Sequence, residues 1–282
     1  MSLKKKIILG TAQFSGNYGI SNNGEKVNSS KLLSFAEKKI KYLDISNKYF
    51  KNNDVPNFIK KNKFKKCLKI TFSNKKNFIK EVDSQIKDYN NIYCLLIHNP
   101  RDLYDKKIKN IIDYLIFLKE KKIIKKIGAS IYTVNDFKQT LKVFDSKPDV
   151  IQLPINIVDR TFLNKKIISI IRSNKIEIHA RSIFLQGLLL INKNNRNSYF
   201  DKWKYLFKEW DKIQSVKKKV TYCIEFLKRL DFVKFVVVGF INKQQLHLFL
   251  KCLEYNVDIK KFKDFKLNDK RLINPSQWKI QN

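Results

Sequence analysis

Short apolar runs alternate along the chain with longer segments in which apolar residues recur every three or four positions. The short runs predict eight strands, over residues 6–9, 41–45, 68–72, 92–97, 124–129, 150–153, 177–180 and 235–238. The longer segments predict helices over residues 30–39, 78–89, 108–121, 134–144, 162–173 and 216–230. Strands that alternate with helices favour parallel pairing through right-handed crossovers.

One (β/α)8 TIM barrel accounts for this alternation over the whole chain, residues 1–282. The interval before the last strand is longer than the others, which predicts an insertion at about residues 192–213, and a C-terminal tail follows at about 256–282. Active sites of such barrels lie on the loops that follow the strands. The functional residues are therefore expected at the carboxyl ends of the predicted strands.

The composition is that of a folded globular chain. Of 282 residues, 43% are apolar, and only 7 are Gly and 5 are Pro, which excludes disordered and collagen-like classes. The apolar runs are too short to span a bilayer, and the N-terminus lacks the apolar segment of a signal peptide. We expect a soluble, cytoplasmic protein that does not contact membranes.

The charge is strongly positive, at +34, and comes almost wholly from lysine. A polyanion-binding protein would show such an excess, and a steep salt dependence of binding would be its mark. Phosphate and base recognition usually relies on Arg, however, and here Lys accompanies abundant Asn and Ile, which share A/T-rich codons. Genome bias explains the charge, and no nucleic-acid partner is expected.

The cysteines and histidines show no spacing typical of a metal site. Cys67, Cys94, Cys223 and Cys252 form no CxxC pair, and the three histidines are far apart. The sequence therefore predicts no metal, with the cysteines acting as small apolar residues. Walker A, GxGxxG, GxSxG and HExxH motifs are also absent from the sequence.

Polar residues stand at or just after several predicted strands. Asp44, His98, Ser130, Gln152 and Arg181 each have an ordinary explanation as a turn former or a structural polar group. The barrel would nevertheless place all of them around one mouth, which makes them candidate site residues.

Seven segments in order resemble the aldo-keto reductase superfamily. They are LGTAQF (9–14) followed by NYGI (17–20), DISNKY (44–49), LLIHNP (95–100), IGAS (127–130), IQLPIN (151–156), RSIFLQGLL (181–189), and VVGF (237–240) followed by Gln245. The resemblance extends over roughly residues 5 to 280. It implies a TIM barrel that reduces a carbonyl compound, which could be an aldehyde, a ketone or a sugar-like substrate. It also implies NADP or NAD as the cofactor.

The resemblance also implies catalytic roles. Tyr49 would be the general acid that protonates the substrate oxygen, and His98 would orient the carbonyl. A phenol has an ordinary pKa of about 10, so it needs a neighbouring cation to act near neutral pH. In this family a lysine, held by an aspartate that corresponds to Asp44, supplies the cation.

The cofactor residues implied by the resemblance come from most of the strand ends. Ser130 and Gln152 would bind the nicotinamide carboxamide, Arg181 would stack on the ring, and Lys243 would meet a 2′-phosphate, which favours NADP. Apolar residues replace the usual adenine-binding Glu-Asn pair in the segment after Gly239. The full set is Gly10, Thr11, Ala12, Asp44, Ser130, Gln152, Arg181, Ser182, Phe184, Gln186, Gly187, Gly239, Asn242, Lys243 and Gln245.

The expected lysine is not at its usual place, where Phe72 stands after Thr71. Lys69 is the nearest candidate, although strand alternation from position 72 would turn it to the opposite face unless a bulge shifts the register. Lys48 and Lys51, which flank Tyr49, are further alternatives.

Two functions of the barrel therefore stay open: a reductase of a small carbonyl compound, and a barrel of the same ancestry that has lost efficient hydride transfer and acts as a binding or regulatory protein. A monomer or a weak oligomer is expected in either case.

Overall fold

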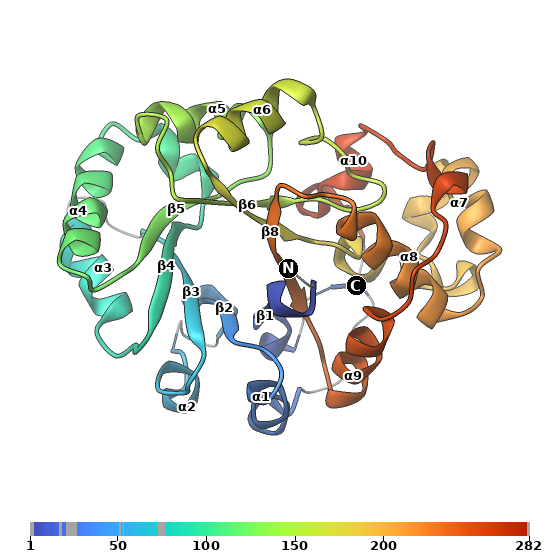
Figure 1. Ribbon diagram of the computed structural model, residues 1–282, viewed down its shortest axis with the longest axis horizontal. Helices are drawn as coiled ribbons and strands as arrows, with labels where there is room; N and C mark the ends of the chain where they lie inside the picture. Colours follow the sequence, from blue (N-terminus) through green and yellow to red (C-terminus); the bar gives the residue numbers. More distant parts are fainter. Residues whose placement is uncertain are drawn as a thin grey trace.

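The computed structural model describes residues 3–16, 19–20, 27–50, 52, 54–72 and 77–280. Eight parallel strands close into a barrel in the order β1 to β8, so the predicted fold class is confirmed (Figure 1). The strands are β1 (Ile7–Gly10), β2 (Tyr42–Ser46), β3 (Lys65–Ile70), β4 (Ile92–Ile97), β5 (Lys126–Ser130), β6 (Val150–Pro154), β7 (Glu177–Arg181) and β8 (Val233–Gly239).

Helices form an outer ring around these strands (Figure 1). Those between consecutive strands are α1 (Ser29–Glu37), α2 (Asn57–Lys60), α3 (Phe78–Ile86), α4 (Ile108–Glu120), α5 (Val134–Val143), α6 (Lys165–Ser173), α7 (Lys204–Asp211) and α8 (Val216–Lys228). After β8 come α9 (Lys243–Cys252) and α10 (Lys270–Ile273). Many begin at a side-chain cap, such as Thr133, whose hydroxyl accepts from the Asp136 backbone N–H while Asp136 caps Thr133 in return.

The third strand differs most from its prediction, because it spans Lys65–Ile70 instead of residues 68–72. The prediction followed the apolar residues, but pairing with β2 sets the strand, and Lys65 to Lys69 lie in register with Tyr42 to Ser46. Lys66 is accommodated because its ammonium donates to the Asn62 carbonyl and to the Asn90 side chain, both at 2.5 Å. The pairing of β3 with β4 also shifts register between Lys66 and Cys67.

Two apolar cores follow from the alternation of the strands. One face of each strand points outward and packs against the helices, in a core that includes Leu68, Leu95 and Ile151. The other face fills the barrel interior, where a separate cluster contains Ile8, Cys67, Cys94, Leu96, Val150 and Phe235. Above this cluster, toward the carboxyl ends of the strands, the interior becomes polar.

The segment between β7 and α8 packs against the C-terminal part of the chain. This segment holds the 3₁₀ helices η8 (Lys193–Asn195) and η9 (Ser198–Trp203), followed by α7. The Trp210 ring stacks on Phe265 with ring centres 4.9 Å apart, and its Nε1 donates to the Leu189 carbonyl at 2.9 Å. Arg160 holds the same region by donating to the carbonyls of Phe262 and Lys263. No helix of the described part is long and apolar enough to cross a membrane.

We predict that Gly128→Ala lowers the free energy of unfolding by about 1–3 kcal/mol, because a methyl group there has no space. A Cβ at this position of β5 would lie 1.7 Å from the Val150 carbonyl oxygen, which belongs to the neighbouring strand. Gly10→Ala is the matched control, since its Cβ would come no closer than 3.4 Å to any atom. Urea unfolding measures both variants; equal stability of the two would contradict the prediction.

Candidate active site

A buried ion pair stands at the polar end of the barrel interior. Lys69 on β3 places its Nζ 2.5 Å from Oδ1 of Asp44 on β2, and the two residues are only 5% and 2% exposed. In the pairing of β2 with β3, Asp44 lies opposite Cys67 and Ser46 lies opposite Lys69. Because alternate residues of a strand share a face, Asp44 and Lys69 both point into the barrel. The structure therefore brings together the predicted aspartate and the first of the candidate lysines.

The remaining polar atoms of this pair also have partners. The Gln152 amide on β6 donates to Oδ2 of Asp44 at 2.8 Å, and its oxygen accepts from Lys69 at 3.3 Å. The Asp44 backbone carbonyl accepts from both the amide and the hydroxyl of Thr11, at 3.1 and 2.9 Å. A buried ion pair is favourable only when such hydrogen bonds offset the loss of hydration.

The surroundings keep Lys69 protonated. Burial alone would lower the pKa of its ammonium, but the Asp44 carboxylate and the Tyr49 hydroxyl outweigh burial and raise this pKa above its ordinary value. Lys69 is therefore a permanent cation at the mouth of the barrel.

Tyr49 and His98 lie next to this cation. Tyr49 ends the 3₁₀ helix η3 (Asn47–Tyr49) that follows β2, and the Lys69 Nζ lies 4.9 Å from the centre of its ring. The His98 ring, just after β4, meets the Tyr49 ring edge-on, with centres 5.8 Å apart. The four predicted catalytic side chains, from three consecutive strands and the loops after them, thus form one group.

His98 is a neutral imidazole. Burial, followed by the charges of Lys69, Arg181 and Lys48, lowers the pKa of His98 to about 2. Its Nδ1 lies 2.9 Å from the Ser46 hydroxyl, which fixes the orientation of the ring. If the Ser46 hydroxyl donates this hydrogen bond, Nε2 carries the ring proton and can donate to a ligand.

The other candidate positions for the lysine lie outside this group. Phe72 follows the end of β3 and is half-buried against the outer apolar core. Lys69 and Phe72 lie on opposite faces, as strand alternation predicts. It is Lys69 that faces the barrel interior, however, whereas Phe72 lies beyond the end of β3 at Ile70. Lys48 is exposed. Lys51 lies outside the described residues, as do Asn17 and Tyr18 of the first resembling segment.

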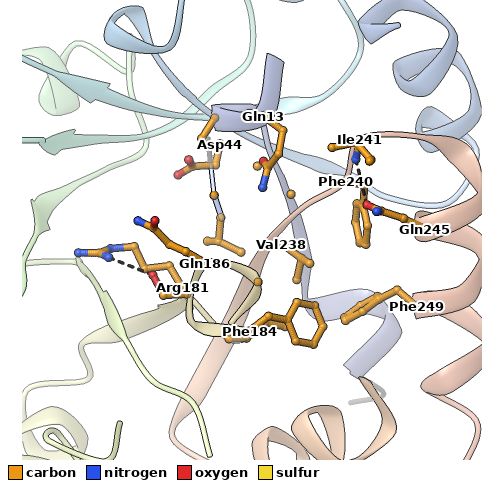
Figure 2. A pocket seen from close by; sticks show the side chains of 18 of the residues that line it. Gln13, Asp44, Arg181, Phe184, Gln186, Val238, Phe240, Ile241, Gln245 and Phe249 are labelled. Carbon is orange, nitrogen blue, oxygen red and sulfur yellow. Dashed lines mark hydrogen bonds between the residues drawn. The ribbon is translucent and has the colours of Figure 1, made fainter. Parts of the chain in front are cut away.

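A pocket opens from the ion pair toward α9 (Figure 2). Figure 2 shows Asp44 and Arg181 on one side of it and Gln245 and Phe249 on the other. Near the ion pair the lining is polar. The far side is apolar and is formed by Phe184 from the segment after β7, by Phe249 from α9 and by further apolar side chains of α8 and α9. The predicted residues that line the pocket are Gly10, Ala12, Asp44, Tyr49, Lys69, Gln152, Arg181, Ser182, Phe184, Gln186, Gly187, Gly239 and Gln245.

The segment after β7 bends sharply around this pocket. Ser182, Leu185 and Gln186 all have positive φ, of 56°, 47° and 51°, which is uncommon for residues other than Gly. The Asn156 side chain donates to the Ser182 carbonyl at 3.1 Å, and the Ile20 amide donates to the Gln186 carbonyl at 3.1 Å. Contacts from two other loops therefore hold a backbone that is unfavourable by itself, as is common at ligand-binding segments.

Arg181 is fixed before any ligand binds. Its guanidinium lies 4.1 Å from the centre of the Tyr132 ring and donates to the Ile131 carbonyl at 2.8 Å and to the Ser182 hydroxyl at 3.3 Å. One face of this planar group is thus covered by Tyr132, while the residue still lines the pocket.

Several predicted cofactor residues lie apart from the pocket lining. Ser130 is buried at the end of β5, and Thr11 binds the Asp44 backbone. Asn242 caps α9 by accepting from the Gln245 amide, and Lys243 is exposed at the first turn of that helix. These residues support the walls of the site or lie at its edge.

The prediction missed Gln13 and Ser46. Gln13 extends over β8 so closely that a Cβ on Gly239 would lie 1.7 Å from its Oε1, and it lines the pocket. It belongs to the first resembling segment, residues 9–14, in which the prediction named only Gly10, Thr11 and Ala12. Ser46 could have been found, because it stands two positions after Asp44 on one strand and so shares its inward face.

The lowered pKa of His98 predicts a loss of stability in mild acid. The unfolded chain protonates this histidine below about pH 6.5, whereas the folded chain does not, so acid favours unfolding. The contribution of neutral His98 to the free energy of unfolding is fully present above about pH 6.5. Between about pH 6.5 and pH 5 the free energy of unfolding decreases by about 2 kcal/mol on account of this residue.

The measurement is urea unfolding at a series of pH values on the unsubstituted chain and on His98→Gln. We expect the pH slope to become shallower in His98→Gln and to stay unchanged in His247→Gln, a control at an exposed position of α9. Identical slopes for the unsubstituted chain and His98→Gln would show that His98 titrates normally.

Comparison with known proteins agrees with this geometry. The chain matches the Aldo/keto reductase family model over residues 6–267. No curated protein matches the sequence. Similar solved structures include a thermostable aldo-keto reductase, Tm1743, with a TM-score of 0.64, 15% identity, and 92% and 93% of the two chains covered. A glycerol dehydrogenase from Gluconobacter oxydans has a TM-score of 0.61 and 17% identity, with 92% of this chain and 90% of that chain covered. An aldo-keto reductase from Bacillus halodurans has a TM-score of 0.62 and 17% identity, with 83% of each chain covered. With its barrel, its buried ion pair and a family match over nearly its whole length, the chain belongs to the aldo/keto reductase family.

Proposed function

We propose that this protein reduces a small carbonyl compound, an aldehyde, a ketone or a sugar-like substrate, with NADPH or NADH. The observation that carries the proposal is the Lys69–Asp44 ion pair beside Tyr49 and His98. This group combines a proton donor, a fixed cation and a neutral hydrogen-bond donor at one mouth of the barrel, as general acid catalysis on a carbonyl oxygen requires.

The pocket next to this group suits a dinucleotide. Polar groups near the ion pair can receive a carboxamide, and the apolar side formed by Phe184 and Phe249, whose rings meet edge to face, can receive a base. Gly10 and Gly239 lie between these two regions, and the Gln13 amide that covers Gly239 offers a polar group there. The hydride for the carbonyl carbon comes from a reduced nicotinamide dinucleotide when one is bound.

In this mechanism Tyr49 donates its phenolic proton to the substrate oxygen. Lys69 stabilises the phenolate that remains, and Asp44 with Gln152 holds the ammonium in place. His98 donates through Nε2 to the carbonyl oxygen, because its ring stays neutral and Ser46 occupies Nδ1. Arg181, held by Tyr132 and Ile131, forms one wall of the reacting region.

The choice between NADP and NAD is proposed to depend on Lys243. This residue is exposed at the first turn of α9, where a helix N-terminus and an ammonium together favour a phosphate. We infer a preference for NADPH on this ground.

The alternative of a barrel without hydride transfer drew its support from the absent lysine at position 72. The contacts of Lys69 with Asp44 and Tyr49 favour the reductase.

Titration with NADPH and NADH, followed by nicotinamide fluorescence at two salt concentrations, tests the cofactor proposal. We expect saturable binding with a preference for NADPH that decreases in Lys243→Gln. Failure of both nucleotides to bind would contradict the proposal. Unsaturable binding that weakens steeply with added salt would instead indicate non-specific attraction of the nucleotide phosphates to surface lysines.

Tyr49→Phe should lower kcat/KM for carbonyl reduction by about 10²–10⁴-fold, the usual contribution of a general acid, and leave nucleotide affinity nearly unchanged. The assay is nicotinamide oxidation with a panel of aldehydes and sugars. Tyr205→Phe, at an exposed position of α7, is the matched control and should keep full activity. Equal activity of Tyr49→Phe and the unsubstituted chain would reject Tyr49 as the acid.

Lys69→Met should lower kcat by at least about 100-fold and cost about 3–5 kcal/mol of stability, because it leaves the Asp44 charge buried and unpaired. Lys48→Met, which removes an exposed lysine next to Tyr49, should change neither quantity.

Phe72→Lys separates the two candidate lysine positions. If Lys69 already supplies the cation, this variant gains no turnover at neutral pH and only loses packing against the outer core. An increase in kcat for Phe72→Lys would mean that the natural site lacks its cation. Circular dichroism confirms that each variant is folded under the assay conditions.

A further inference from the structure

A second group of reactive side chains lies in the barrel interior, below the Asp44–Lys69 pair. The two Sγ atoms of Cys67 on β3 and Cys94 on β4 and a ring nitrogen of His179 on β7 all lie within 4.8 Å of one another. The three residues are 0% exposed. Cys67 shares the inward face of β3 with Lys69, one layer deeper, and lies in register with Cys94 on the neighbouring strand.

His179 has one occupied and one free ring nitrogen. Its Nε2 lies 2.8 Å from Oε1 of Glu177, whereas the buried Nδ1 has no hydrogen-bond partner. A carboxylate on Nε2 holds the ring proton there, so that Nδ1 keeps a bare lone pair. Leaving a buried acceptor unsatisfied is unfavourable, which makes this atom an exception that needs an explanation.

Glu177 is itself held by its neighbours. The Tyr93 hydroxyl donates to both carboxylate oxygens, at 2.9 and 3.0 Å, and the Lys126 ammonium lies 2.5 Å from Oε2. The charge of Glu177 is thus already balanced by Lys126. A histidine oriented by a fixed carboxylate is the usual arrangement behind a metal-binding imidazole.

We propose that Cys67, Cys94 and His179 form a structural Zn²⁺ site that ties β3 and β4 to β7 across the barrel. Two thiolates and one imidazole nitrogen supply three of the four ligands of a tetrahedral zinc site. Binding releases the two thiol protons to solvent, and the two thiolate charges then neutralise the ion. No oxidation or reduction takes place.

The spacing of the three ligand atoms permits this coordination. Zn–S bonds of about 2.3 Å and a Zn–N bond of about 2.0 Å place tetrahedral ligand atoms about 3.5–3.8 Å apart. The present separations of at most 4.8 Å need contractions of up to about 1.3 Å, which small rotations of both cysteine side chains would supply. We assign the coordination to Nδ1 of His179, which would give this nitrogen its missing partner.

The first test measures zinc in the full-length chain, produced in zinc-supplemented medium and freed of loosely bound metal by gel filtration with EDTA. We expect about one zinc per chain by plasma mass spectrometry. The double variant Cys67→Ala/Cys94→Ala should lose it. Cys223→Ala/Cys252→Ala is the matched control, since these two thiols are equally buried but lie on α8 and α9, and should keep it.

The second test needs no variant. The chain produced with Co²⁺ in place of Zn²⁺ should show the near-ultraviolet thiolate-to-cobalt band and the strong visible bands of a tetrahedral site. Three results would each overturn the proposal: far less than one zinc per chain with no cobalt band, zinc that remains in Cys67→Ala/Cys94→Ala, or a disulfide between Cys67 and Cys94 found by mass spectrometry.

Discussion

The buried ion pair between Asp44 and Lys69 is the contact on which the candidate site depends. Removing two charges from water costs several kcal/mol for each ion, and only close pairing with further hydrogen bonds offsets that cost. Gln152 supplies those bonds from β6 to both charged groups, so the pair fixes β2, β3 and β6 relative to one another. The positions of Tyr49 and His98 follow, because both are packed around the Lys69 ammonium and its immediate neighbours.

The barrel interior is arranged in layers with different chemistry. The ion pair and Gln152 occupy the layer at the mouth, the two cysteines and His179 lie below it, and Tyr93, Glu177 and Lys126 close the opposite end. Each ionised group in this interior faces a partner of opposite charge, as a region of low dielectric constant requires. The layers let one barrel hold a reactive end and a separate internal cluster of thiols and imidazole.

The pocket is shaped by both backbone and side chains. Residues with positive φ after β7 bend the chain around it, and the Gln13 side chain covers Gly239. Hydrogen bonds from Asn156 and Ile20 hold the strained segment in place. These hydrogen bonds join the segment after β7 to two other loops, so the shape of this part of the pocket depends on contacts between loops.

The sequence by itself determined the barrel, because the periods of apolar residues that distinguish strands from helices are local properties of the chain. It also placed Asp44, Tyr49 and His98 at strand ends, where the parallel topology brings them to one mouth. Only the tertiary structure decided that Lys69 points inward, since pairing with β2 and not local pattern sets where β3 begins and ends. It alone brought Cys67, Cys94 and His179 together, because closure of the barrel joins strands whose separation along the chain carries no metal-binding spacing.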